Sequence, residues 1–447
     1  MARPRTKRLR GLLALAVPLA LLAGACADDD DDDDTSTDAG SDDTGGDDGG
    51  DDGGDGDRVV TIFGPEVEGE AQGLLDSFAD FEEETGIDVQ VQGDRSFEQQ
   101  IGVRVDGGDP PDIAMFPQPA KISDFAADLV PLSDEVLATV EENFDAGWTD
   151  LVTVDGDVMA IPAKADLKSL VWYSPEAFAT AGYEVPETME DLLALADTMV
   201  ADGNTPFCIG IGSDAATGWP MTDWIEDFML RLEGPEVYDQ WWQHEIPFDD
   251  PAVVGVVQFV VDLWSAPGYV FGGMQNIAAT PFAEAGLPLL DGDCMMHRQG
   301  NFYAANWPEG TTLGEDGQVN AFYLPTFADQ DFGRVTLSGG IYASAFSDRP
   351  EVEETMQFIA STEYSDARAP VGGFLSPNRN TDASLYPTEI EQNFATILAE
   401  ADPVRFDASD LMPGAVGAGT FWSAAVDMTT GTSVEQALGE VEASFPE

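Results

Sequence analysis

The sequence predicts an α/β protein that is long enough for two domains. Near its N-terminal end, short β-branched runs alternate with amphipathic helical segments, a pattern typical of a parallel sheet with helical crossovers. The chain has 447 residues, of which 43% are hydrophobic, so each of two domains can bury a core. Helical patterns predominate after Thr188.

The first elements predict strand, helix, strand, helix and strand at 58–63, 66–84, 87–91, 97–105 and 112–116. Ligands in such sheets bind beyond the carboxyl ends of the strands. Residues 64–66 and 117–119 are therefore expected at a binding edge. Later patterns predict strands at 167–173, 318–324 and 335–345, and helices at 188–200, 250–264, 351–361 and 433–444.

The net charge of the chain is −67, from 18 Lys and Arg against 85 Asp and Glu. Five of the bases lie in the first 26 residues and 16 Asp lie in 28–57, which leaves 13 bases and 69 acids from Arg58 onward. Such a surface repels nucleic acid and anionic lipid. A saline habitat and the general acidity of an extracellular protein both remain open as reasons for it.

The N-terminus predicts export. A basic stretch precedes an apolar run, 11–25, that is short for a membrane span. Ala23-Gly24-Ala25-Cys26 resembles a lipoprotein cleavage site, and we expect 1–26 to be a lipoprotein signal with Cys26 lipidated. Ordinary cleavage near Ala25 is the alternative. Residues 27–57 are almost wholly Asp, Gly, Ser and Thr, and we expect a disordered acidic linker.

Only three cysteines occur, Cys26, Cys208 and Cys294. With Cys26 assigned to lipid, an exported chain favours a Cys208–Cys294 disulfide, which on the chain-entropy model stabilises by roughly 4 kcal/mol. Two buried free thiols are the alternative. His244 and His297 lack the spacing of metal ligands, so we expect no metal and no cofactor.

A series of short motifs resembles, in order, the extracellular solute-binding proteins of ABC sugar importers, the class of maltose-binding and α-glucoside-binding proteins. The motifs are PDIA at 111–114, KSLVWYS at 168–174, AGYEVPET at 181–188, TGWP at 217–220, DWIED at 223–227, MMHRQGNF at 295–302, LSGG at 337–340, FW at 421–422 and SVEQAL at 433–438. The segments around Cys208 and Cys294 are most similar to the α-glucoside branch, which also suggests the disulfide.

The resemblance implies a two-lobed fold like that of periplasmic binding proteins, each lobe a mostly parallel sheet flanked by helices. It implies an N-lobe of 58–165 plus 338–373 and a C-lobe of 166–337 plus 374–447. The chain would cross between lobes near Lys164, Leu337 and Gly373, with Gly372 and Gly373 as a hinge.

The resemblance also implies the function. We expect a monomeric, lipid-anchored protein on the extracellular face of the membrane that captures a neutral sugar and delivers it to the permease subunits of an ABC importer. A di- or oligosaccharide such as an α-glucoside is the expected solute. The expected ligand-binding residues are flat aromatic or polar, which suits the C–H faces and hydroxyls of a sugar: Glu66, Gln118, Asp166, Lys168, Trp172, Asp214, Trp219, Phe302, Gly339, Gly340 and Trp422.

Other functions remain open. A binding protein for glycerol phosphate would need an arginine cluster, which the sequence does not display. A polyamine-binding protein would suit the acidity. A glycoside-active enzyme needs two carboxylates, but with 69 acids some pair always fits, so we expect no enzyme. A passive surface adhesin would lack a hinged cleft.

Overall fold

The largest sheet gathers strands from distant parts of the sequence. The computed structural model describes residues 58–446. The sheet has the order β11-β10-β3-β1-β2, and β6 pairs with β10 off this path. Its strands are β1 (Val59–Gly64), β2 (Asp88–Gly93), β3 (Ile113–Phe116), β6 (Ile161–Leu167), β10 (Thr336–Ala345) and β11 (Val404–Phe406).

The predicted alternation of strands and helices at the start of the folded part is confirmed, with one correction. β1 pairs in parallel with both β2 and β3. The helix expected at 66–84 is two helices, α1 (Glu68–Asp76) and α2 (Ala79–Thr85). The chain turns between them because Phe78 is fully buried and the Ser77 hydroxyl donates to the Leu74 carbonyl at 2.6 Å.

Alternate residues of this sheet belong to two separate cores. Ile62 and Ile341 pack with α1, α2, α5 and α14 on one face, whereas Phe63 and Tyr342 pack with α3 and α4 on the other. This is the side-chain period of two that a sheet covered on both faces requires. The two faces are covered by α3 (Phe97–Asp106), α4 (Pro119–Asp124), α5 (Asp134–Asn143) and α14 (Pro350–Ile359), with α6 (Ala146–Asp150) and α15 (Thr362–Arg368) beside them.

A second sheet has three strands, β7 (Leu170–Tyr173), β8 (Met296–Arg298) and β9 (Asn320–Tyr323), in the order β8-β7-β9. Both of its pairings are antiparallel, so the expectation of a mostly parallel sheet is wrong for this part. Parallel neighbours require a crossover that returns the chain to the starting end of the sheet. Here a long run of helices separates β7 from β8 instead. β4 (Thr153–Val154) and β5 (Asp157–Val158) form a small hairpin.

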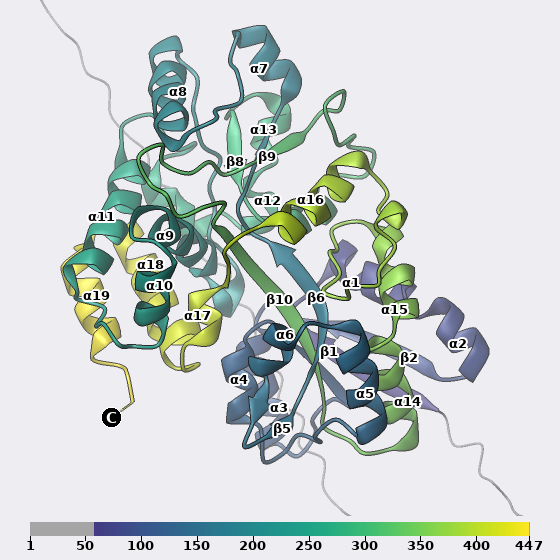
Figure 1. Cartoon of the computed structure of the whole chain (residues 1–447). Coiled ribbons are helices and arrows are strands. Elements are labelled where there is room, and N and C mark those ends of the chain that lie inside the picture. Colours follow the sequence, from purple (N-terminus) through teal and green to yellow (C-terminus); the bar gives the residue numbers. More distant parts are fainter. Residues whose placement is uncertain (1–57, 447) are drawn as a thin grey trace, which may run out of the picture. The chain divides into compact units, whose positions relative to one another are not determined.

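The remaining helices lie beside the second sheet or gather around α9, as Figure 1 shows. They are α7 (Pro175–Ala181), α8 (Met189–Asp202), α9 (Trp219–Leu232), α10 (Pro235–Trp242), α11 (Pro251–Ser265), α12 (Phe282–Ala285), α13 (Pro288–Asp291), α16 (Glu389–Glu400), α17 (Ala408–Leu411), α18 (Trp422–Thr429) and α19 (Val434–Glu442). The short turns are η1 (Asp214–Ala216), η2 (Met274–Ala279), η3 (Asn301–Asn306), η4 (Ala369–Val371), η5 (Ala383–Leu385) and η6 (Val416–Phe421).

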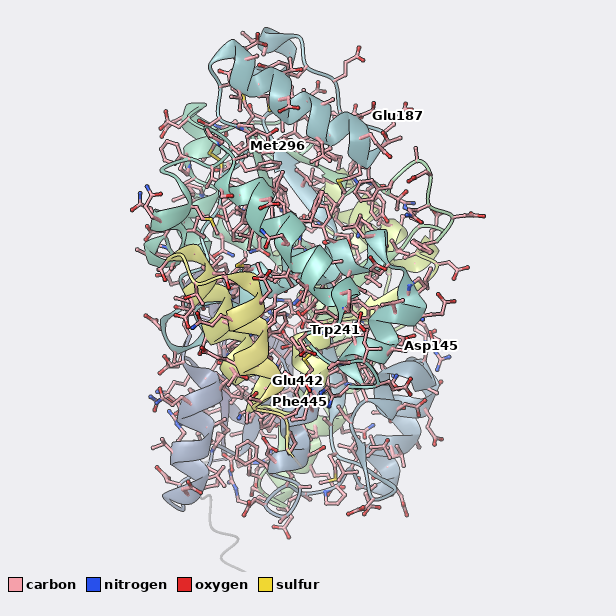
Figure 2. All side chains as sticks on the ribbon, turned by 90° about the vertical axis from the view of Figure 1, so that its left-hand side faces the viewer. Asp145, Glu187, Trp241, Met296, Glu442 and Phe445 are labelled. Atoms are coloured by element: carbon pink, nitrogen blue, oxygen red, sulfur yellow. A yellow bond between two sulfur atoms is a disulfide. The ribbon has the colours of Figure 1, made fainter. Side chains whose placement is uncertain are left out.

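The later predicted helices are confirmed as α8, α11, α14 and α19. Each apolar stripe faces a core, and α11 and α19 join the largest one. At the end of α19, Glu442 and Phe445 lie near one another (Figure 2). Both contact His244, Glu442 through a hydrogen bond between its Oε2 and the imidazole Nε2 at 3.0 Å and Phe445 through a stacked ring at 3.6 Å, which gives this histidine a structural role.

Three segments that the sequence analysis identified as crossing points lie side by side. Lys164 of β6 is the register partner of Ile341 of β10. The Ala165 N–H donates to the Leu375 carbonyl at 2.8 Å, just after Gly373. In Figure 1, β6 and β10 run together from the region of β1 and β2 toward that of β8 and β9.

Gly372 and Gly373 have φ angles of +89° and +66°, which glycine adopts without strain. The Gly373 N–H donates to Glu391 Oε1 at 2.9 Å, and a Cβ at Gly373 would lie 2.9 Å from that of Ala305.

No helix among residues 58–446 combines the length and apolarity that a membrane crossing requires. The predicted signal 1–26, the lipidated Cys26 and the linker 27–57 lie outside the described residues.

Candidate functional site

A cavity of about 120 Å³, here called the inner cavity, lies beyond the carboxyl ends of β1, β2 and β3, where the sequence predicted a binding edge. Segments from across the chain complete it, from β6 and β10 to α9, α17 and α18. Eight of the eleven expected ligand-binding residues line it: Glu66, Gln118, Asp166, Lys168, Trp219, Phe302, Gly340 and Trp422.

Three expected residues lie elsewhere. Trp172 is fully buried in the core, where its Nε1 donates to the Gln299 carbonyl at 2.9 Å and its ring packs on Trp307 and Phe394. Its side chain points away from the cavity because alternate residues of β7 face opposite cores.

Gly339 and Asp214 are also absent from the wall of the inner cavity. A Cβ at Gly339 would lie 2.6 Å from Lys168 Cε, so this glycine makes room for the lysine. Asp214 is exposed in η1 and lines a neighbouring cavity instead.

Aromatic rings form one side of the inner cavity. Trp219, at the first position of α9, has its ring centroid 4.9 Å from that of Phe282 and 6.0 Å from that of Phe302. Trp422 completes this side with a buried indole N–H that has no hydrogen-bond partner. Phe282 is not predictable from the sequence, because a phenylalanine in a four-residue helix carries no pattern that separates it from a core residue.

An ion-paired group adjoins the aromatic side, with Lys164 Nζ 5.6 Å from the centroid of the Phe302 ring. Lys164 Nζ is 2.8 Å from Glu66 Oε1, and Arg368 Nη2 is 3.2 Å from Glu66 Oε2. Burial alone would raise the pKa of Glu66, but the two cations outweigh it and lower that pKa. The carboxylate is therefore ionised and held in place.

A second set of polar side chains lacks partners. Glu98 Oε2, Gln118 Oε1 and Asp166 Oδ1 are buried oxygens without a hydrogen bond, and we call these three residues the acceptor wall. Asp166 Oδ1 also lies 3.7 Å from Lys164 Nζ, an ion pair beyond hydrogen-bond distance. Gln118 Nε2 donates to Glu98 Oε1 at 3.1 Å, which fixes the amide orientation. Burial raises the pKa of both Glu98 and Asp166. Buried acceptors are normally satisfied, so these three are suited to a ligand that donates hydrogen bonds.

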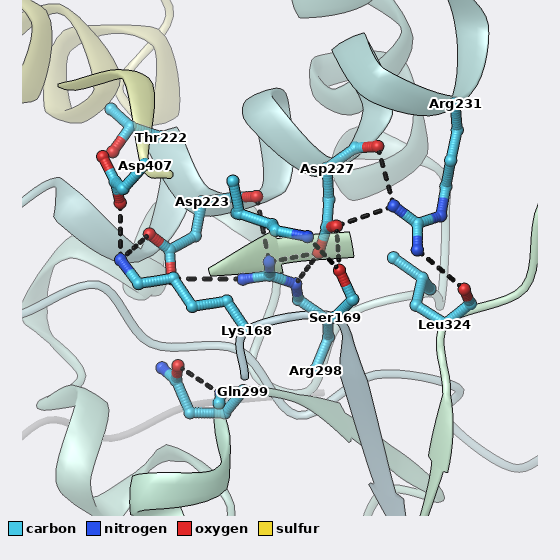
Figure 3. A network of polar contacts seen from close by, with 12 residues as sticks. Lys168, Ser169, Thr222, Asp223, Asp227, Arg231, Arg298, Gln299, Leu324 and Asp407 are labelled. Atoms are coloured by element: carbon cyan, nitrogen blue, oxygen red, sulfur yellow. Dashed lines mark hydrogen bonds and ion pairs between the residues drawn. The ribbon is translucent and has the colours of Figure 1, made fainter. Parts of the chain in front are cut away.

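Behind the cavity lies a buried ionic network, drawn in Figure 3, that comprises Lys168, Ser169, Asp223, Asp227, Arg231, Arg298 and Asp407. Lys168 Nζ is 3.0 Å from Asp223 Oδ1 and 2.5 Å from Asp407 Oδ2. Its ammonium also lies 5.7 Å from the centroid of the Trp219 ring. Lys168 thus joins the network to the aromatic side of the cavity.

Asp227 is the carboxylate at the centre of the network. It accepts from Ser169 Oγ at 2.6 Å, from Arg231 Nη1 at 2.7 Å and from Arg298 Nε at 3.0 Å. Burial would raise its pKa, but the Arg298 and Arg231 guanidiniums hold the pKa below its usual value. All of these partners come from the chain itself.

Asp223, Glu226 and Asp407 bring carboxylate oxygens within 4.8 Å of one another. The Lys168 ammonium bonds to two of the three, so the chain supplies the cation that this group needs. Burial raises the pKa of Asp223 to about 7, whereas Lys168 overcomes burial and lowers that of Asp407 to about 2. The second histidine, His297, bonds to the Cys208 carbonyl at 2.9 Å, and burial lowers its pKa to about 4.

The predicted disulfide between Cys208 and Cys294 is present and connects residues 86 apart. It ties the strand-like segment at Cys208, whose N–H donates to the Met296 carbonyl, to the segment that leads into β8. Because β8 pairs with β7, the bond supports the sheet from which Lys168 and Ser169 extend.

Comparison with known proteins identifies the family. Residues 64–363 match the family described as "Bacterial extracellular solute-binding protein". The chain belongs to this family. It is 42% identical to the osmoprotective compounds-binding protein GgtB of Synechocystis sp., over 87% of this chain and 92% of that protein. It is 39% identical to the alpha-glucosides-binding periplasmic protein AglE of Rhizobium meliloti, over 87% of each.

The fold is that of two-lobed sugar-binding proteins. The bacterial solute receptor AcbH, described as having an exclusive preference for β-D-galactopyranose, matches with a TM-score of 0.74. That alignment covers 87% of this chain and 98% of AcbH at 20% identity.

Proposed function

We propose that this solute-binding protein is the capture component of an ABC-type carbohydrate importer and that it binds a neutral, hydroxyl-rich solute in the inner cavity. The observation that carries the proposal is that aromatic rings and buried oxygens without a hydrogen-bond donor line the same cavity. A sugar or polyol presents C–H faces to such rings and hydroxyl donors to such acceptors. An acceptor left unpaired in the interior costs about 1–3 kcal/mol, which a donor on the solute recovers.

Charge supports a neutral solute over an anionic one. The cations that line the inner cavity are Arg95, Lys164 and Lys168, and each already pairs with a carboxylate of the chain. A phosphate would have to displace one of these acids, which leaves a buried negative charge uncompensated. Glycerol phosphate is therefore disfavoured.

The relatives support the same solute class. Two proteins about 40% identical to this chain are named for osmoprotective compounds and for α-glucosides. An α-glucoside, or a compact osmoprotective compound with several hydroxyls, fits the acceptor wall. Glu98, Gln118, Asp166, Trp219, Phe302 and Trp422 are the residues that we propose contact it.

The proposed lobes are 58–165 plus 338–373 and 166–337 plus 374–447, with a hinge at the three adjacent crossing segments and Gly372-Gly373. Walls from both proposed lobes meet at the inner cavity, with Gln118 from one and Trp219 from the other. A solute that touches both walls only when the lobes are closed shifts the equilibrium toward the closed form. Permease subunits would then recognise that form, and Cys26 would anchor the chain to the membrane through its lipid.

Titration calorimetry on the compact unit from Asp55 onward tests the proposal. We expect a neutral α-glucoside such as maltose, trehalose or sucrose to bind with a micromolar Kd, which corresponds to about −8 kcal/mol. Glycerol phosphate and spermidine should not bind. If spermidine binds and no sugar does, the acceptor wall would be reassigned to an amine ligand. If none of the solutes binds, the proposed function would lose its support.

A further inference from the structure

A second and larger cavity adjoins the inner one. This outer cavity has a volume of about 700 Å³ and is lined from the α1, η1, η2, α12 and η3 regions. Asp214, which the sequence analysis placed at the ligand, lies in its wall. The residues common to the walls of both cavities are Glu70, Arg95, Ser213 and Phe282. These four residues therefore form the partition between the two spaces.

Arg95 is the residue that joins the two sides of the partition. Its Nη2 lies 2.6 Å from Glu70 Oε2, and its Nη1 donates to the Pro65 carbonyl at 3.5 Å. The same guanidinium lies over the Phe282 ring, with its central carbon 4.6 Å from the ring centroid. Glu70 and Pro65 follow β1, whereas Phe282 begins α12 and packs on Trp219. One side chain thus closes the space between the two walls.

The partition consists mainly of side chains, so it can open without a change of fold. Arg95 lies in the short loop between β2 and α3, and its side chain is 20% exposed, whereas that of Glu70 is 7% exposed. Beside it, the Ala215 N–H donates to Ser96 Oγ at 3.4 Å, a long hydrogen bond between the same two walls. The arginine is the longest and most accessible of the groups that separate the cavities.

The volumes of the two cavities show that the partition limits the size of the solute. The inner cavity, at about 120 Å³, is below the roughly 300–1,000 Å³ of typical small-molecule sites. A solute of more than one ring therefore needs space from the outer cavity. To reach the outer cavity, the second sugar ring of such a solute must displace the Arg95 side chain from Phe282 and from Glu70. The buried Glu70 carboxylate then loses its cation.

From these contacts we propose that Arg95 is the specificity-determining residue that sets an upper limit on the size of the solute. This inference rests on the proposed function and adds the size class of its substrate. With Arg95 in place, the site favours a compact glycoside, and longer oligosaccharides bind more weakly. Without Arg95, the two cavities merge and a chain of rings can extend past Phe282 toward Asp214.

The test is a length series measured by titration calorimetry on the unit from Asp55 onward. The probes are methyl α-glucoside, maltose, maltotriose and maltotetraose. The quantity compared is the Kd of maltotetraose divided by the Kd of whichever of methyl α-glucoside and maltose binds more tightly. For the unmodified chain we expect this ratio to be at least ten. For Arg95→Ala we expect it to fall below three. The ratio is the relevant readout, because a general loss of packing weakens all four probes alike.

Two further variants keep the test decisive. Glu70→Gln combined with Arg95→Ala removes the buried unpaired carboxylate that destabilises the single variant, and it should give the same flattened length series. Arg104→Ala is the matched control, because Arg104 also covers an aromatic ring, Phe63 at 4.0 Å, but lines neither cavity. Its length series should equal that of the unmodified chain.

The outcomes separate the two proposals. If the sugars bind and the length series is the same with and without Arg95, the size limit is overturned while the proposed function stands. A tetrasaccharide that binds the unmodified chain as tightly as the shorter probes would also overturn it. If no sugar binds any variant, both proposals fail.

Discussion

Two polar clusters border the inner cavity, and they differ in whether the chain supplies their partners. In the buried ionic network, Asp227 receives donors from Ser169, Arg231 and Arg298. In the acceptor wall, Asp166 and Gln118 are almost as buried, at 7% and 4% exposure, yet each retains an oxygen without a donor within hydrogen-bond distance. Burial and polarity are therefore similar in both, and the missing partners distinguish the wall. An interior tolerates such a deficit where a ligand supplies the donor.

The largest expected effect comes from breaking the complete cluster. Asp227→Ala leaves Arg231 and Arg298 buried without their shared carboxylate, and removal of one partner from such a pair costs about 3–5 kcal/mol. Urea denaturation should show this loss in the free energy of unfolding. Asp249→Ala is the control, since Asp249 is exposed, and it should change that free energy by less than about 0.5 kcal/mol. A loss below 1 kcal/mol for Asp227→Ala would mean that the network is not what holds this region together.

A pair of tryptophans extends the comparison to apolar side chains. Trp172→Ala removes a fully buried core residue and should lower the free energy of unfolding by about 3–5 kcal/mol. Trp219→Ala removes a cavity wall, so it should weaken solute binding at least tenfold with a smaller loss of stability. Denaturation and calorimetry on both variants separate the two roles. Equal effects of both substitutions on binding would contradict the assignment.

These two residues also show how far the sequence predicts the site. Both are tryptophans in motifs shared with sugar-binding proteins, and a motif carries no information about the direction of a side chain. Trp172 lies on β7, where alternate residues face opposite cores, whereas Trp219 begins α9 at the cavity. Whether Trp172 points to the cavity or to a core depends on how β7 pairs with β8 and β9, strands more than a hundred residues away.

The fold was more predictable than the site because its signals are local. The alternation of β1, β2 and β3 with helices, the positions of α8, α11, α14 and α19, and the Cys208–Cys294 bond all follow from short patterns or composition. Arg95, Phe282 and Asp407 could not be found this way. They stand in loops or very short helices, and only tertiary packing brings them to the cavity.

The acceptor wall gives the next effect in size. Asp166→Ala deletes an oxygen that we expect to accept from a solute hydroxyl, and a hydrogen bond to a charged group contributes about 1.5–3 kcal/mol. Affinity should therefore fall by roughly 10- to 150-fold, while the free energy of unfolding changes little, because Lys164, 3.7 Å from Asp166 Oδ1, keeps its shorter ion pair with Glu66 at 2.8 Å. Calorimetry together with urea denaturation measures both. A variant that binds normally but unfolds more easily would place Asp166 with the structural cluster instead.

The smallest effect per step of the measurement, at most about 1.4 kcal/mol per pH unit, is a pH dependence at the edge of the network. Burial, followed by the nearby Asp407 and Asp223 carboxylates, raises the pKa of Glu226 well above its usual value. Between the unfolded and folded pKa values the folded chain keeps this proton and the unfolded chain does not. Unfolding then releases a proton, so stability falls as pH rises, by up to about 1.4 kcal/mol per pH unit.

Glu226→Gln keeps the shape of the neutral acid and cannot titrate. Its free energy of unfolding relative to the unmodified chain should therefore increase steadily from pH 5 to pH 8, as urea denaturation at each pH measures. The opposing contribution of His297, whose pKa is lowered to about 4, is present in both proteins and cancels in the difference. A difference that does not change with pH would show that Glu226 is ionised in the folded chain. Three neighbouring carboxylates, those of Asp223, Glu226 and Asp407, would then carry one more negative charge than we expect.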